Sequence, residues 1–363
     1  MKPMRITIVI PNIGLDGGLR VAALYAERLT ARGHHVVLAA RRQRPLRKSH
    51  VARKLLAGRG VWRRWADPTH FDRIDCDLQI VTEFRPIDDR DLPDADVVVA
   101  TWWETAEWVS HLSPSKGKPV YFLQGYDAGS GQPADRVDAT WRLPMQKITV
   151  AQWLADKARD EFNDPNAIIV PNGVDTTLFN APPRHAKPAT PTIGFVYHDL
   201  PIKGCDLIFG ALEQLRSKHH NLRVRSFGLI GSTPRLPIPN WVEHNVCPKH
   251  TRIVDLYSSC TAWAWGSRQE GFGLPILEAM ACRTPVVATS AGAAPDLLAS
   301  GEGGLLVPAD DANALADGLH EILSLNDNEW TRSSEQARAI AERHNWDRAV
   351  ELFEGALRRV ADA

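Results

Sequence analysis

The stretch that most constrains this chain runs from Ser267 to Cys282, with the sequence SRQEGFGLPILEAMAC. Short apolar runs at 261–265 and 285–289 lie on either side of it and are expected to be buried strands. Strand, glycine-rich turn, helix and strand form a βαβ unit, in which the two strands run parallel and the crossover is right-handed. The stretch therefore predicts an α/β protein built on parallel sheets.

The turn in this stretch has the chemistry of a phosphate site. Pro275 suits the first turn of the helix, because the backbone N–H that proline lacks has no partner there. Glu278 follows about one turn later and leans back toward the helix N terminus. Glu270 lies on the loop, where Gly271 and Gly273 allow close approach to the backbone. Because free N–H groups and the helix dipole favour phosphate, we expect two carboxylates to frame a phosphate-accepting pocket.

Length and composition fit a soluble protein of two domains. The chain has 363 residues and a formal net charge of +0, and overall charge therefore argues against a nucleic-acid-binding protein. Its five cysteines form no CxxC pair, which disfavours a zinc site or a disulfide framework and fits a reducing compartment. The apolar run at 6–10 is too short for a signal-peptide core, and no apolar stretch is long enough to cross a bilayer. We therefore expect a cytoplasmic protein.

The first half of the chain begins as a nucleotide-fold βαβ without the dinucleotide fingerprint. Strands are expected at 6–10 and 35–40, with a helix at 19–32 between them. The connecting loop holds Gly17 and Gly18 but no GxGxxG pattern, so a dinucleotide site is poorly supported. A helix cap with glycines for the turn is the alternative interpretation.

Two later strands of this half end in side chains suited to a ligand. The strand expected at 96–100 leads into Trp102 and Trp103, and the strand at 120–123 ends at Gln124. Open α/β sheets bind ligands at the carboxyl ends of their strands. Stacking of the tryptophans on a sugar face and packing in the core are both consistent with the sequence.

Residues 41–64 contain ten Lys or Arg and no Asp or Glu. A solvated loop is one interpretation of this segment. A basic surface that docks on anionic lipid headgroups, or on a phosphorylated acceptor, is the other. The second interpretation would place the protein at the inner face of the cytoplasmic membrane. Nucleic acid is disfavoured as a partner by the neutral overall charge.

Residues 180–191 are rich in proline and are predicted to be a linker. We therefore expect an N-terminal domain at 1–180 and a C-terminal domain at 181–345. The terminal helix, 346–363, is expected to pack back on the first domain. The second domain begins with a strand at 192–197 and a loop that holds Lys203.

Several motifs together resemble the retaining glycosyltransferases of family 4. They are EGFGLPILEAMAC from Glu270, TPVVAT from Thr284, GLLVP from Gly304, PNGVD from Pro171 and the Lys203–Gly204 pair. The resemblance covers nearly the whole chain and is most specific between residues 270 and 308. It implies the GT-B fold, in which two Rossmann-like domains with parallel sheets face each other across a cleft.

The resemblance also implies roles for individual residues. Lys203 corresponds to the lysine that faces the donor diphosphate, and Glu278 to the glutamate that binds the ribose hydroxyls. Glu270 corresponds to the glutamate that contacts the donor sugar, and no nucleophile is assigned. The backbone of Gly271, Phe272, Gly273 and Leu274 would contact the donor, and Gly17 and Gly18 would approach the phosphate and the acceptor. Such enzymes need no metal and no cofactor, because a lysine, a helix dipole and backbone amides stabilise the leaving diphosphate.

Two positions depart from the family pattern. His198 stands near the place of a usual arginine and would be only partly charged at neutral pH. Gln124 replaces a histidine that contacts the donor sugar, and a glutamine there resembles rhamnosyl-transferring members of surface-polysaccharide pathways.

The leading hypothesis is transfer of a sugar from a nucleoside-diphosphate sugar to a glycan or lipid-linked acceptor in polysaccharide or glycoconjugate biosynthesis. A nucleotide-sugar hydrolase or epimerase of the same fold, and a catalytically silent GT-B binding module, are the alternatives.

Overall fold

The computed structural model describes residues 2–14, 16–42, 70–71 and 74–363, which form two compact α/β units, as predicted. The first unit comprises Met1–Thr149, Ala155–Ile168 and Val350–Ala363, and the second comprises Val150–Leu154 and Ile169–Ala349. The chain therefore passes between the units near residues 150, 155, 169 and 350, and not at the proline-rich stretch 180–191. No helix within the described ranges is long and apolar enough to cross a membrane.

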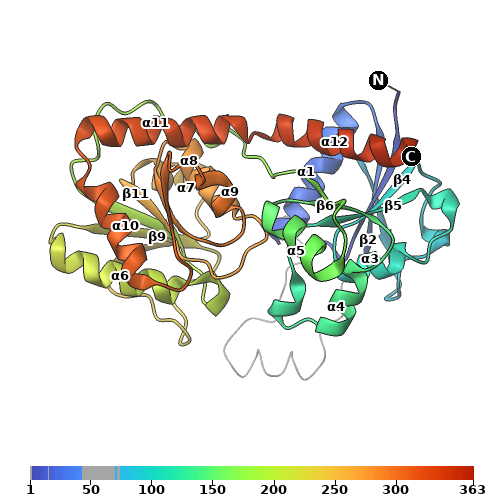
Figure 1. The fold of residues 1–363 in the computed structure, drawn as a ribbon, viewed down its shortest axis with the longest axis horizontal. Helices are drawn as coiled ribbons and strands as arrows, with labels where there is room; N and C mark the ends of the chain where they lie inside the picture. The colour runs from blue at the N-terminus through green and yellow to red at the C-terminus, as the bar shows by residue number, and fades with distance from the viewer. Residues whose placement is uncertain (1, 15, 43–69, 72–73) are drawn as a thin grey trace. The chain divides into compact units, whose positions relative to one another are not determined.

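A seven-stranded sheet forms the centre of the first unit (Figure 1), with the strand order β3-β2-β1-β4-β5-β6-β7. Its strands are β1 (Arg5–Ile10), β2 (His35–Arg41), β3 (Asp77–Val81), β4 (Val97–Ala100), β5 (Lys118–Leu123), β6 (Gln146–Thr149) and β7 (Ile168–Ile169). The helices are α1 (Gly17–Ala31), α3 (Trp103–Val109), α4 (Ala134–Trp141) and α5 (Gln152–Phe162). The pairs from β3 to β6 are parallel. Continuous apolar runs such as VVVA in β4 are buried throughout, as expected for a parallel sheet covered on both faces.

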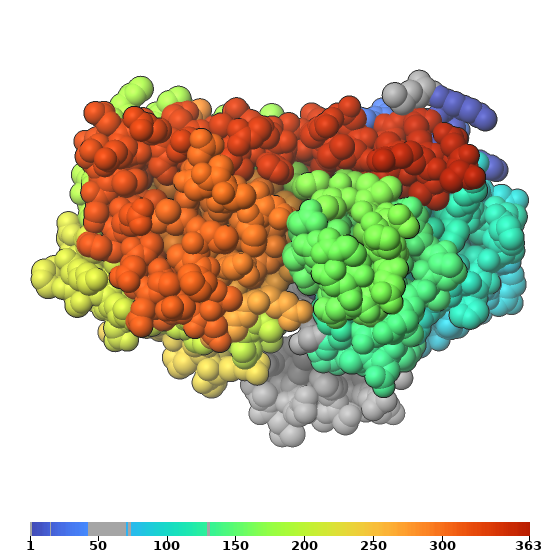
Figure 2. Space-filling model, viewed as in Figure 1, coloured from blue at the N-terminus to red at the C-terminus, as the bar shows by residue number. Residues whose placement is uncertain are grey.

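The C-terminal helix α12 (Trp346–Asp362) supplies part of the core of the first unit. Phe353 stacks on Tyr25 with ring centroids 4.2 Å apart, and its centroid lies 5.0 Å from that of Phe122. Glu354 accepts hydrogen bonds from Arg32 and Arg358, each at 2.9 Å. Figure 2 shows the red C-terminal residues lying against the blue and green surface of this unit.

The second unit is built on a six-stranded parallel sheet with the order β10-β9-β8-β11-β12-β13. Its strands are β8 (Thr192–Val196), β9 (Arg223–Gly228), β10 (Val242–Val246), β11 (Ala262–Trp265), β12 (Val286–Thr289) and β13 (Gly304–Val307). The helices are α6 (Cys205–Lys218), α7 (His250–Ser258), α8 (Leu274–Ala281), α9 (Ala294–Leu298), α10 (Ala312–Ser324) and α11 (Asp327–Arg343). Trp330 of α11 is fully buried in this core, and its indole N–H donates to the Thr261 carbonyl at 2.9 Å.

The strand order reverses once in each sheet, between β1 and β4 in the first and between β8 and β11 in the second. In open α/β sheets the crevice beside such a reversal, at the carboxyl ends of the strands, is where ligands bind. Both candidate sites described below lie at these ends.

Candidate functional site

Lys203 and Glu270 form an ion pair at the carboxyl end of the second sheet. Lys203 Nζ lies 2.7 Å from Glu270 Oε1, and the hydroxyl of the buried Ser267 donates to the same oxygen at 2.9 Å. The Lys203 side chain is 33% exposed and that of Glu270 is 12% exposed. Glu270 takes one of the three N–H groups of the ammonium, and the partial exposure leaves the cation accessible to an anionic ligand.

The backbone around Lys203 is fixed by a close approach between two loops. Lys203 ends the short 3-10 helix Pro201–Lys203, and Gly204 then adopts a left-handed conformation with φ +59°. A Cβ atom at Gly204 would overlap the carbonyl oxygen of Gly266, so only glycine fits. In addition, the Ile202 carbonyl accepts a hydrogen bond from the backbone N–H of Arg268 at 2.8 Å. These contacts set the distance between Lys203 and the loop that carries Glu270.

The N terminus of α8 follows directly after this loop. Gly273 caps the helix with φ +99°, and Leu274 and Pro275 open it, so the sequence-predicted helix start is observed. Glu278 lies in the second turn, where Glu278 Oε2 accepts a hydrogen bond from the Tyr257 hydroxyl at 2.9 Å. The positive end of the helix dipole therefore lies within the same loop region as the Lys203 ammonium.

The loop before α8 is held by hydrogen bonds to its backbone carbonyl groups. Phe272 is buried, and its carbonyl accepts the Ala293 N–H at 2.8 Å. The carbonyl of Gly271 accepts the indole N–H of Trp153 at 2.9 Å. Phe272 and Gly271 thus hold the loop in place through their backbone oxygens.

The surroundings of His198 disfavour the cationic form of its ring. Burial, followed by the nearby Lys203 charge, lowers the pKa of the imidazole. The Leu200 N–H donates to His198 Nδ1 at 3.1 Å, and the neutral ring therefore carries its proton on Nε2. The histidine can donate one hydrogen bond, but it does not replace the charge of an arginine.

Two residues that shape this site, Arg268 and Gly292, were not singled out from the sequence. Arg268 bridges Asp206 and Asp310 beside the Lys203 loop. Gly292 has φ +61°, and a Cβ there would press on Glu270 Cβ and the Phe272 carbonyl. Arg268 follows Ser267 inside the predicted motif and could have been found there. Its acidic partners lie far away in the sequence, Asp206 in the first turn of α6 and Asp310 after β13.

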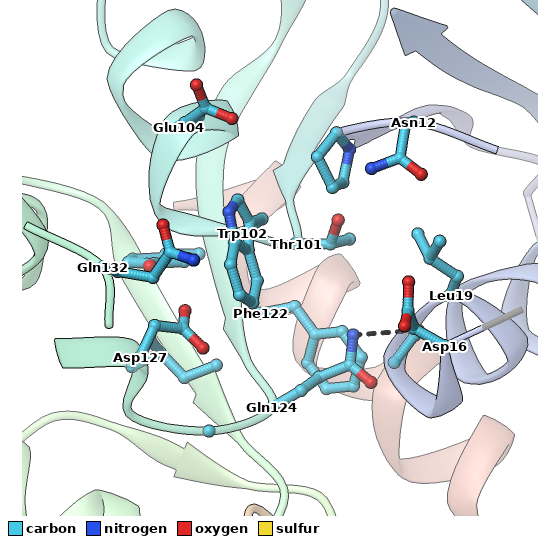
Figure 3. Close-up of a pocket in the computed structure, with 15 residues that line it drawn as sticks. Asn12, Asp16, Leu19, Thr101, Trp102, Glu104, Phe122, Gln124, Asp127 and Gln132 are labelled. Carbon is cyan, nitrogen blue, oxygen red and sulfur yellow. Dashed lines mark hydrogen bonds between the residues drawn. The ribbon is translucent and has the colours of Figure 1, made fainter. Parts of the chain in front are cut away.

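The first unit holds a pocket of about 510 Å³ at the carboxyl ends of β1, β4 and β5 (Figure 3). Its polar lining includes the side chains of Asn12, Asp16, Glu104, Gln124, Asp127 and Gln132, and Trp102 contributes an aromatic ring. Burial raises the pKa of Asp127 to about 7, so this carboxyl group titrates near neutral pH. Asp127 was not predicted from the sequence.

The predicted acceptor residues are divided between this pocket and the core. Gln124 and Gly18 both line it, and Gln124 Nε2 donates to the Gly18 carbonyl at 3.2 Å, the dashed contact in Figure 3. Trp102 also lines the pocket, but Trp103 is buried at 4% exposure with Arg136 over its ring. Packing in the core, the alternative raised from the sequence, describes Trp103. Gly17 starts α1, and a Cβ atom there would meet no heavy atom of the described residues within 4 Å.

The basic segment at 41–64 lies almost wholly outside the described residues. Its first member, Arg41, is paired with Glu104 at 3.2 Å and lies over the rings of Phe84 and Trp108. Arg41 therefore contributes to the fold of the first unit. Among the described residues, no group of three or more His, Cys, Asp or Glu could hold a metal ion.

Residues 190–325 match the family described as Glycosyl transferases group 1. The second unit carries a group 1 glycosyltransferase domain. Over 254 residues the chain is 30% identical to D-inositol 3-phosphate glycosyltransferase of Acidothermus cellulolyticus, covering 62% of this chain and 54% of that protein. It is 31% identical over 217 residues to phosphatidyl-myo-inositol mannosyltransferase of Mycolicibacterium smegmatis, covering 54% and 52%. The chain thus spans about half the length of the curated relatives it matches.

Solved structures of glycosyltransferases share the fold. Sucrose-phosphate synthase from Thermosynechococcus elongatus superposes with a TM-score of 0.70 at 18% identity, covering 98% of both chains. Anabaena Alr3699/HepE, in complex with UDP and glucose, gives 0.72 at 17% identity, covering 98% of this chain and 100% of that one. The fold is GT-B, as the sequence motifs predicted. At these identities the likeness concerns the fold alone.

Proposed function

We propose that this protein is a glycosyltransferase that takes its sugar from a nucleoside-diphosphate sugar bound by the second unit. The observation that carries the proposal is the Lys203 ammonium, 2.7 Å from Glu270 on the loop that leads into the N terminus of α8. A lysine and a helix N terminus together form a binding site for a diphosphate. This pair lies inside the segment that matches the group 1 glycosyltransferase domain.

The proposed reaction breaks the bond between the anomeric carbon of the sugar and the diphosphate oxygen, and forms a bond from that carbon to an acceptor hydroxyl oxygen. The departing phosphate oxygen takes the hydroxyl proton, on the same face of the sugar, so the configuration is retained. Lys203 and the α8 dipole offset the charge that builds on the leaving group, and no metal or other cofactor is required. Glu270 positions the donor sugar, and Glu278 binds the ribose hydroxyls.

The proposed acceptor is a glycan or a lipid-linked glycan in glycoconjugate biosynthesis. Its support is the pocket of the first unit, where Trp102 offers a ring face and Gln124 an amide. The names of two relatives contain D-inositol 3-phosphate and phosphatidyl-myo-inositol, and both compounds have a ring that bears hydroxyl groups. We further propose a cytoplasmic protein that docks on anionic lipid through the basic segment at 41–64.

Nucleotide binding tests the proposal directly. A ligand that binds only the native state raises the melting temperature, so UDP, GDP, ADP and dTDP are compared with and without EDTA. One nucleotide is expected to stabilise the protein, and EDTA should leave the shift unchanged. Lys203→Ala is expected to reduce both this shift and sugar transfer by at least about tenfold. Lys218→Ala is the matched control, because Lys218 is 54% exposed on α6, in the same unit.

Two outcomes would contradict the proposal. If Lys203→Ala retains wild-type turnover, Lys203 does not have the proposed role in sugar transfer. A protein that responds to none of the four nucleotides would fit the silent binding module instead.

A further inference from the structure

A tyrosine hydroxyl on a neighbouring helix is bound to the carboxylate of Glu278. Tyr257 lies near the end of α7, and its hydroxyl donates to Glu278 Oε2 on α8 at 2.9 Å. Tyr257 is fully buried, whereas Glu278 is half-buried. A hydrogen bond to an ionised acceptor is about twice as strong as one between neutral groups. The tyrosine hydroxyl therefore restricts where this carboxylate lies.

The core of the second unit holds the ring of Tyr257 in place. The ring packs on Trp263 with centroids 4.3 Å apart, and it lies nearly perpendicular to Phe227 with centroids 5.5 Å apart. Trp263 and Phe227 are themselves buried. The backbone carbonyl of Tyr257 also accepts the hydroxyl of Thr284 at 2.8 Å. Because a close-packed core resists movement of its side chains, the Tyr257 hydroxyl is presented to α8 from a fixed position.

The orientation of a carboxylate matters when it binds a sugar that has two neighbouring hydroxyls. An ionised carboxylate has about four acceptor positions on its two oxygens, and the tyrosine hydroxyl takes one of them. Hydrogen bonds weaken steeply when the donor and the acceptor are misaligned. Two hydroxyls of one ring therefore donate well to the same carboxylate only when its oxygens face both of them.

We propose that Tyr257 is a positioning residue for the nucleotide. By holding Glu278 in one orientation, it increases the affinity of the second unit for the sugar hydroxyls of the nucleoside diphosphate. The proposal rests on the proposed function, in which Glu278 binds these hydroxyls. A purely structural role of the same hydrogen bond would connect α7 to α8 and would affect all nucleotides equally. The two roles differ in whether the tyrosine hydroxyl favours nucleotides that carry sugar hydroxyls.

The test compares nucleotides with and without these hydroxyls. Dissociation constants are measured on the full chain for UDP, GDP, ADP and dTDP, and for the 2′,3′-dideoxy form of each. The hydroxyl preference is the constant for the dideoxy form divided by the constant for its parent. For the parent nucleotide that binds the wild-type protein best, this preference should be at least about tenfold, because hydrogen bonds to a charged group are strong. Tyr257→Phe should reduce the preference several-fold, through weaker binding of the parent alone.

Two further variants separate positioning from a general loss of structure. Tyr197→Phe is the matched control, because Tyr197 is also fully buried in the second unit and its hydroxyl donates to the Leu236 carbonyl at 2.6 Å. This variant should keep the wild-type hydroxyl preference. Glu278→Gln should reduce the preference, and adding Tyr257→Phe to it should cause little further reduction. Such non-additivity is expected because Tyr257 acts through Glu278.

Several results would overturn the inference. If Tyr257→Phe keeps the wild-type hydroxyl preference while Glu278→Gln loses it, the glutamate binds the sugar without help from the tyrosine. If Tyr257→Phe weakens the parent and dideoxy forms equally, the hydrogen bond is structural only. If the wild-type protein has no hydroxyl preference, Glu278 does not bind these hydroxyls and the inference fails, although binding of the diphosphate still supports the proposed function. If no nucleotide binds, the inference and the proposed function fail together.

Discussion

Replacing Arg268 by alanine removes a set of contacts that connects the start of α6, the 3-10 helix Pro201–Lys203 and the segment after β13. The guanidinium makes two hydrogen bonds to Asp206, each at 2.8 Å, one to Asp310 at 2.7 Å and one to the Pro201 carbonyl at 2.6 Å. Asp206 and Pro201 flank the turn that presents Lys203. The side chain therefore sets the geometry of a site that it does not itself enter.

The loss of stability can be worked out from these contacts and their exposure. The Arg268 side chain is 28% exposed, but Asp206 and Asp310 are 50% and 66% exposed, so solvent weakens both ion pairs. Exposed pairs contribute about 0.2–1 kcal/mol each, and the carbonyl bond contributes about 0.5–1.5 kcal/mol. Arg268→Ala should therefore lower the free energy of unfolding by about 2 kcal/mol. For a unit of this size, that corresponds to a fall in melting temperature of about 4–8 °C.

Thermal unfolding and nucleotide titration, applied to the same variant, test this estimate. We expect the nucleoside diphosphate to bind several-fold more weakly, because the Pro201 carbonyl in the turn before Lys203 loses its hydrogen bond from Arg268. Arg252→Ala is the matched control. Arg252 makes one 3.2 Å contact with Glu243, and both side chains are more than 40% exposed. If Arg268→Ala resembles Arg252→Ala in both measurements, the bridging contacts do not hold the site.

Two further substitutions test the fold around each site. Gly204→Ala forces a Cβ against the Gly266 carbonyl at a left-handed φ of +59° and should cost more than about 2 kcal/mol in chemical denaturation; an unchanged midpoint would contradict the overlap. Burial would raise the pKa of Glu354, but its hydrogen bonds from arginine and histidine prevail and lower it to about 2. Since that pKa is below the unfolded value of about 4.3, the carboxylate stabilises the fold above about pH 4 and loses this effect as pH falls toward 2. Glu354→Gln should therefore be less stable than wild type at pH 7, with a difference that shrinks on acidification, and a difference independent of pH would contradict the assignment.

The regular elements of the buried sheets were predictable because parallel strands covered on both faces are continuous apolar runs. The strands at 6–10, 97–100 and 286–289 have this pattern and lie where they were expected. The edge strand β3 was not predicted, because Asp77–Val81 mixes polar and apolar residues and is only partly buried. Its place in the sheet follows from pairing with β2, which local sequence does not encode.

The residues at which the chain crosses from one unit to the other were harder to predict than the helices and strands. The prolines before residue 191 indicated a linker, but the chain changes units near 150, 155, 169 and 350. These positions depend on contacts such as the hydrogen bond from the Val174 N–H to the His344 carbonyl at 2.8 Å. The two residues of this hydrogen bond are far apart in sequence, so composition does not indicate that they are in contact.

In the candidate sites, the proximity of some residues was predictable from the sequence, but the chemical properties of others were not. Lys203 and Glu270 follow two strands that are neighbours at the reversal point, so the fold brings their loops together. The raised pKa of Asp127 depends on how deeply the fold buries one carboxyl group, and the sequence does not show this.

The two sheets offer equivalent positions at their reversal points, but the charge beside these positions differs between the two units. Each unit has a reversal point with a helix that starts beside it, α1 in the first and α8 in the second. At α1 the N-cap residue is Asp16, whose carboxylate lines the pocket and opposes a phosphate. At α8 the N-cap is Gly273, the first turn has no acidic residue, and Lys203 provides a cation on a neighbouring loop. The same topology therefore places a carboxylate beside the helix start in the first unit and a lysine beside it in the second. If this difference in charge controls the proposed binding of the diphosphate, Asp16→Asn should leave nucleotide affinity unchanged, whereas Lys203→Ala should lower it.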